Sequence, residues 1–116
     1  MWTTLCACWR WVLGRFKAPK HAYKLFLSDS RYTAQEAARS GEVVAIFNDS
    51  GKPKWAYFMC PCGCGQQLAL NLMPTQLPHW RVSILSDTDF SVLPSVDSTT
   101  CGAHFWLRNG RITWCE

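Results

Sequence analysis

Cysteine is the residue type whose spacing points most directly to chemistry in this chain of 116 residues. Three of the seven cysteines, Cys60, Cys62 and Cys64, lie within the run Cys-Pro-Cys-Gly-Cys-Gly. An odd number of cysteines with such close neighbours is a poor disulfide framework, because adjacent thiols cannot easily reach disulfide geometry. Several thiolates presented by one bend are typical zinc ligands. The pattern therefore predicts a metal site with zinc as the cofactor.

The remaining zinc ligands have to come from elsewhere in the chain. Cys101 is the natural remote ligand, with Cys115 and His104 in reserve, so six candidates compete for about four places. A closed four-cysteine site would be structural, whereas three protein ligands and a water would be catalytic. We predict four ligands: Cys60, Cys62, Cys64 and Cys101.

Ser95 and His104 are candidates for a nucleophile and its base. His104 follows Cys101 by three residues, so it could bind the metal or act as a general base beside it. Ser95 follows a proline at the end of a predicted strand, and a serine held in this way could present its hydroxyl to an imidazole. From spacing alone, a hydroxyl that caps a turn is the simpler interpretation of Ser95. Asp97 could orient His104, although no motif demands it.

Hairpins have to position these residues, because the sequence from Glu42 onward has the alternation and the turn residues of β-strands. We predict strands over residues 23–27, 42–47, 54–59, 67–72, 80–85, 89–93, 103–108 and 111–115. Asn109-Gly110 predicts a type I′ turn. This turn sets Phe105 opposite Trp114 on the core side and His104 opposite Cys115 on the other face.

Helices are predicted only towards the N-terminal side. Residues 2–17 can form a short amphipathic helix. Thr33-Ala34-Gln35-Glu36 is a capping-box pattern that predicts a helix over residues 34–39, with Gly41 as its stop. We therefore predict an α+β fold, a small zinc-stabilised domain of mainly antiparallel β hairpins with one or two N-terminal helices.

The charges divide the chain into two parts. Residues 1–24 carry five basic residues and no acidic one, whereas residues 25–116 are nearly neutral. We predict a basic amphipathic arm over residues 1–24, which contacts an acidic protein or a membrane surface, and one zinc-binding domain over residues 25–116. A nearly neutral body argues against nucleic-acid binding by the folded core.

Two further observations concern the cellular compartment. No apolar run approaches the roughly 20 residues of a membrane-spanning helix, which argues against a transmembrane protein. The apolar start of the chain is interrupted by Arg10 and lacks a small-residue cleavage site, so we expect no secretory signal. Together with the cysteine usage, this predicts a protein of the reducing cytoplasm.

The order of motifs over roughly residues 42–116 resembles a family of small bacterial proteins of uncharacterised-domain type. The motifs that carry the resemblance are Cys60-Pro61-Cys62-Gly63-Cys64-Gly65, Pro78-His79-Trp80, Leu93-Pro94-Ser95-Val96 and Cys101-Gly102-Ala103-His104-Phe105-Trp106. The family is associated with bacterial ubiquitin-like conjugation operons and is similar to zinc-containing peptidases. The resemblance implies that Ser95 is the nucleophile and His104 its base, while the Cys60 cluster and Cys101 hold zinc.

Two functions follow as hypotheses. The first is a deubiquitinase-like peptidase that processes or removes a bacterial ubiquitin-like modifier, with that modifier, its conjugates and conjugation-pathway proteins as partners. Its serine mechanism uses Ser95 and His104, with an oxyanion site near Gly102 and a zinc-activated water as the variant mechanism. The alternative is a non-catalytic zinc-binding adaptor, in which Trp55, Trp80 and Trp106 form a recognition surface.

Overall fold

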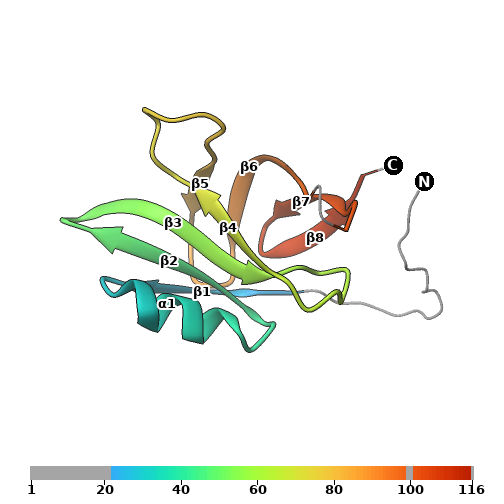
Figure 1. Cartoon of the computed structure of the whole chain (residues 1–116), viewed down its shortest axis with the longest axis horizontal. Helices are drawn as coiled ribbons and strands as arrows, with labels where there is room; N and C mark the ends of the chain where they lie inside the picture. Colours follow the sequence, from blue (N-terminus) through green and yellow to red (C-terminus); the bar gives the residue numbers. More distant parts are fainter. Residues whose placement is uncertain (1–21, 99–100, 116) are drawn as a thin grey trace.

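Two four-stranded sheets and one helix make up the computed structural model, which describes residues 22–98 and 101–115 (Figure 1). The first sheet has the order β1-β2-β3-β4, with the bounds Lys24–Ser28, Val43–Asp49, Lys52–Met59 and Gln67–Asn71. The second sheet has the order β5-β6-β7-β8, with the bounds Arg81–Ile84, Phe90–Asp97, His104–Arg108 and Arg111–Trp114. Helix α1, Arg31–Ala38, connects β1 to β2.

The predicted α+β class with N-terminal helices is wrong, because the described fold is mostly β. The described part of the chain contains one helix of eight residues, and this helix follows a strand rather than preceding the sheets. Strands β1 and β2 are parallel, and parallel neighbours require a crossover connection, which α1 supplies. The helix predicted over residues 2–17 lies outside the described residues, and the division at residue 24 stays a prediction.

The start of α1 also differs from the prediction. Ser30 is the N-cap, and its side-chain oxygen accepts a hydrogen bond from the Thr33 N–H at 3.2 Å. Thr33 is therefore inside the first turn rather than at the cap, because a serine three residues upstream offers the same capping hydroxyl. The helix ends at Ala38, and Gly41 follows with φ +83° as the predicted stop.

The strand predictions are confirmed for all eight strands to within a few residues, with β6 as the main exception, because it continues to Asp97. The final hairpin has the predicted register: Phe105 faces Trp114 and Leu107 faces Ile112. Asn109 and Gly110 both have positive φ, at 53° and 72°, as a type I′ turn requires.

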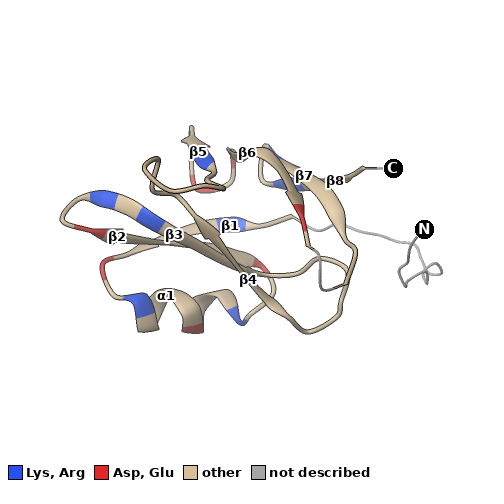
Figure 2. Ribbon diagram, turned by 45° about the horizontal axis from the view of Figure 1, so that its top comes forward, with Lys and Arg blue, Asp and Glu red and all other residues tan. Residues whose placement is uncertain are grey.

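The core lies between the two sheets. Its largest fully buried side chains are Phe58, Phe90, Phe105, Ile46, Leu107, Val44 and Val92. The rings of Phe58 on β3 and Phe105 on β7 meet edge to face at 6.1 Å, so aromatic contact joins one sheet to the other. Helix α1 covers the opposite face of the first sheet (Figure 2). On that face, Ala34 and Ala38 pack against Tyr57.

The turn at Gly110 yields a stability prediction. A Cβ at Gly110 would lie 2.5 Å from the Thr88 carbonyl oxygen, and the residue has φ +72°. Gly110→Ala is expected to lower the free energy of unfolding by about 3 kcal/mol, because it combines left-handed strain with a steric clash. Urea denaturation measures the loss.

Gly51→Ala is the matched control for this prediction. Gly51 occupies the β2–β3 turn with φ +78°, and no atom lies within 4 Å of its ideal Cβ. The substitution keeps the strain without the clash and should cost about 1 kcal/mol. Equal losses for the two variants would contradict the close approach of Thr88 to the final turn.

Candidate functional site

The β3–β4 loop presents the clustered cysteines. Strand β3 ends at Met59, and the loop is closed by hydrogen bonds from the Cys60 N–H to the Gln66 carbonyl at 2.9 Å and from the Gly63 N–H to the Cys60 carbonyl at 3.3 Å. Gly63 and Gly65 have φ +87° and +84°, a conformation that glycine adopts without steric cost. The Cys-Pro-Cys-Gly-Cys-Gly run thus folds into a tight turn that brings its three thiol groups close together.

Cys101 reaches this turn from the β6–β7 loop of the second sheet. The loop is held by the Ser98 N–H, which donates to the Ala103 carbonyl at 2.7 Å, and by the Gly102 N–H, which donates to the Ser98 carbonyl at 2.8 Å. The Cys101 thiol also lies 3.6 Å from the Ser98 hydroxyl. These bonds fix the fourth cysteine opposite the other three.

The four sulfur atoms of Cys60, Cys62, Cys64 and Cys101 all lie within 4.8 Å of one another. Cys60, Cys62 and Cys101 form a triangle with sulfur–sulfur distances of 3.4, 3.6 and 3.5 Å. A tetrahedral site with metal–sulfur bonds of about 2.3 Å has sulfur–sulfur edges of roughly 3.8 Å. The cysteines are free thiols, so this group could hold a metal ion.

The electrostatics of the cluster favour a thiolate at Cys62. Hydrogen bonding from the Cys60 thiol, supported by Cys64 and Cys101, lowers the pKa of Cys62 to about 5. The same contact with Cys62, together with burial, raises the pKa of Cys60. One thiolate therefore forms readily and suppresses the ionisation of its neighbour. A metal cation at the centre would remove this conflict, because it favours deprotonation of every thiol that binds it.

Ser95 and His104 lie side by side on β6 and β7. The Ser95 hydroxyl oxygen is 3.1 Å from His104 Nε2, within hydrogen-bond distance. His104 is exposed and Ser95 is half-buried, so a substrate can reach both. A general base has to lie within such a distance of the hydroxyl that it deprotonates, so the pair fits the geometry of a nucleophile and its base.

A β-bulge positions Ser95, which corrects its predicted place at the end of a strand. Val92 pairs with Leu107 and Val96 pairs with Phe105, so three residues of β6 lie opposite a single residue of β7. Extra residues in one strand bend it and re-aim its side chains, often beside active sites. Strand β6 continues through Pro94 and Ser95 to Asp97 instead of ending before them.

Three neighbours surround the Ser95–His104 pair. The Trp80 indole N–H donates to the Ser95 carbonyl at 3.2 Å and holds the bulge from the β5 side. Asp97 is the cross-strand partner of His104. Hydrogen-bonded and non-hydrogen-bonded pairs alternate along antiparallel strands. The next pair, Ser98 and Ala103, is hydrogen-bonded, so Asp97 and His104 form a non-hydrogen-bonded pair, the kind in which the side chains lie closer together. The Cys115 N–H donates to the His104 carbonyl at 2.9 Å, which extends the predicted hairpin register.

The structure bears on two of the open alternatives. Within the described residues, neither His104 nor Cys115 belongs to the group of four cysteines that could hold a metal ion. The Gly102 N–H is used by the Ser98 carbonyl, so it is not available for the oxyanion site suggested near that residue. The support of Ser95 by Trp80 was not predicted, although the Pro78-His79-Trp80 motif marks this segment of the sequence.

A serine hydroxyl in contact with an imidazole is an arrangement found in serine hydrolases. Residues 30–115 match the family described as bacterial ubiquitination-like system serine protease (BubE). The match covers most of the chain, and the chain belongs to this family. No curated protein and no solved structure matches it.

The family favours the protease hypothesis over the adaptor. Trp55, Trp80 and Trp106 are all half-buried, and the Arg108 guanidinium lies over the Trp106 ring at 4.2 Å from its centroid. Among the described residues no helix has the length and apolar character to span a membrane.

Proposed function

We propose that this chain is a serine peptidase that processes or removes a bacterial ubiquitin-like modifier, with Ser95 as the nucleophile and His104 as the general base. The observation that carries the proposal is the 3.1 Å contact between the Ser95 hydroxyl and His104 Nε2 on an accessible face of the second sheet. Membership of a family of serine proteases from bacterial ubiquitination-like systems supports both the chemistry and the substrate class.

The proposed reaction has two steps. His104 Nε2 accepts the Ser95 proton while the serine oxygen attacks the scissile carbonyl, and the resulting imidazolium then protonates the leaving amine. Water, deprotonated by the same imidazole, hydrolyses the acyl-serine and restores both groups. Asp97, the cross-strand partner of His104, would orient the imidazole ring in this reaction.

We propose that zinc occupies the four-cysteine group and is structural. Four thiolates complete a tetrahedral zinc site and leave no position for a reactive water, which argues against the zinc-activated water as the mechanism. Bound zinc would join the β3–β4 loop to the β6–β7 loop. Cys101 lies three residues before His104, so this link would fix the segment that carries the base.

The test of this function is cleavage of a ubiquitin-like protein from the same kind of system, produced with a C-terminal extension. We expect the purified protein to remove the extension at the end of the modifier, and phenylmethylsulfonyl fluoride, which sulfonylates activated serines, to stop the reaction. Mass spectrometry of the products locates the cleaved bond. Cleavage that resists this reagent would rule out the serine mechanism, and intact substrate would rule out processing activity.

A further inference from the structure

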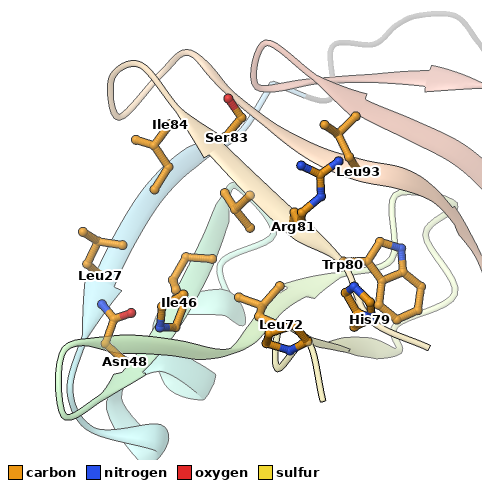
Figure 3. A pocket seen from close by; sticks show the side chains of 13 residues that line it. Leu27, Ile46, Asn48, Leu72, His79, Trp80, Arg81, Ser83, Ile84 and Leu93 are labelled. Atoms are coloured by element: carbon orange, nitrogen blue, oxygen red, sulfur yellow. The ribbon is translucent and has the colours of Figure 1, made fainter. Parts of the chain in front are cut away.

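A groove of about 520 Å³ runs between the first sheet and strand β5 (Figure 3). Its walls are mainly apolar: Leu27, Ile46 and Leu72 line one side, and Val82 and Ile84 of β5 line the other. Leu27 is 54% exposed and Ile84 is 48% exposed, although both are large apolar side chains. Such exposure of apolar surface on both walls of one groove is typical of a binding site.

One end of the groove is formed by His79 and Trp80 (Figure 3). His79 Nδ1 is buried and has no hydrogen-bond partner among the described residues. An unpaired buried polar atom costs roughly 1–3 kcal/mol, so this nitrogen favours an incoming polar group. Trp80 is the residue whose indole N–H holds the Ser95 carbonyl, and the groove therefore ends against the strand that carries the proposed nucleophile.

Leu93 gives a second connection between the groove and Ser95. Leu93 lines the groove together with Arg81, its cross-strand partner on β5. It lies two residues before Ser95 on β6, and both residues belong to the bulge between Val92 and Val96. The groove therefore reaches the segment of β6 that carries Ser95.

The backbone of β5 offers a further recognition element, because β5 is the edge strand of its sheet. The Leu85 N–H donates to the Asp89 carbonyl at 2.9 Å, and antiparallel hydrogen bonding alternates from residue to residue. Counting back from this pair, Val82 and Ile84 direct their backbone N–H and C=O groups away from β6 and towards the groove. An extended peptide can add to such an edge as a further strand.

We propose that this groove binds an extended segment of the substrate next to the scissile bond, with apolar side chains at alternate positions and its backbone paired to β5. The inference rests on the proposed function and adds which substrate sequence the same site would recognise. Pairing with four residues of β5 covers roughly 13 Å of extended chain. Alternate side chains of that segment enter the space between Ile84 and Leu27, and a polar group near the Trp80 end bonds His79 Nδ1.

Peptide binding to a Ser95→Ala variant tests the groove without any catalytic step. The probe is a fluorescein-labelled peptide of about seven residues with leucine at alternate positions, and fluorescence polarisation reports its binding. A second peptide has glutamate in place of each leucine. We expect the leucine peptide to bind at least about tenfold more tightly, and Ile84→Glu or Leu27→Glu to weaken its binding about tenfold or more.

Leu85→Glu is the matched control. Leu85 is adjacent to Ile84 and 78% exposed, but it does not line the groove, so this substitution should leave peptide binding unchanged. Equal affinity for the two peptides, or equal losses for Ile84→Glu and Leu85→Glu, would overturn the groove assignment. Sedimentation that shows a dimer abolished by Ile84→Glu, without leucine-dependent peptide binding, would assign the groove to a second copy of the chain and would also overturn it.

A failure of the groove proposal can be distinguished from a failure of the proposed peptidase function. Leucine-dependent binding without any Ser95-dependent cleavage would remove the peptidase function and leave the groove as a peptide-binding site. Ser95-dependent cleavage without leucine-dependent binding would leave the peptidase and remove the groove from its specificity.

Discussion

Ser95→Ala is expected to lower kcat/KM for the extended modifier by at least about 10⁴-fold, because the proposed acyl-serine can no longer form. The hydroxyl bonds His104, and no other hydrogen bond to it is found within residues 22–98 and 101–115. Its removal should therefore change the free energy of unfolding by less than about 1 kcal/mol. Cleavage rates and urea denaturation of the same preparation measure the two quantities.

His104→Ala should lose activity to a comparable extent, and the double variant should be little worse than either single one, because the two residues act as one unit. Ser91→Ala is the matched control. Ser91 lies on the same strand, but its hydroxyl accepts a hydrogen bond from the Asn109 N–H at 3.0 Å, far along the strand from the proposed base. We expect full cleavage by this variant. Retained cleavage by Ser95→Ala would exclude Ser95 as the nucleophile.

Removal of the metal should have the second large effect, this time on stability. We expect the purified protein to contain one zinc ion and Cys101→Ser to lose it, because three thiolates bind zinc more weakly than four. Cys101 joins loops of the two sheets, so the loss should lower the free energy of unfolding by about 3 kcal/mol or more, which corresponds to roughly 10 °C in Tm. Metal analysis and thermal denaturation measure both.

Cys115→Ser provides the comparison for this variant. Cys115 is a half-buried free thiol outside the sulfur group, so its substitution should keep the zinc and change Tm by no more than a few degrees. A chelator should abolish cleavage only as the fold is lost. If chelation stopped cleavage while the protein stayed folded, a catalytic metal would replace the structural one.

The β-strands were predictable because each one is bounded by turn residues and alternates in polarity. Asn109-Gly110 alone defined the pairing of Phe105 with Trp114 and of Leu107 with Ile112. The fold class was not predictable in the same way. It depended on a helical pattern over residues 2–17, outside the described residues. The predicted order of strand, helix and strand over residues 23–47 is that of a βαβ unit, but local periodicity does not show which strands pair.

The two parts of the candidate site were predictable to different extents. Three of the four clustered cysteines are close together in sequence, so their spacing alone indicated a common site. Cys101 was the natural fourth member, because it is the next cysteine along the chain after Cys64. The contact between Ser95 and His104 depends on a bulge between Val92 and Val96. Bulges arise from pairing between strands and from support such as the Trp80 indole, and neither is visible in the residues around Ser95.

The apolar groove was not anticipated at all, because its walls come from both sheets. Leu27 and Ile84 are ordinary strand residues in the sequence, and their shared exposure appears only when β1 and β5 are placed opposite each other. The Pro78-His79-Trp80 motif is the one local sign of the groove, and it belongs to a connection between strands rather than to a strand.

The most direct measurement of the central claim is the site of covalent labelling by diisopropyl fluorophosphate. This reagent phosphorylates a serine only when a neighbouring base activates its hydroxyl. Tandem mass spectrometry of the labelled full chain should find one adduct, on Ser95, and His104→Ala should abolish it. A chain that stays unlabelled, or that carries its adduct on another serine, would contradict the assignment of Ser95 and His104 as nucleophile and base.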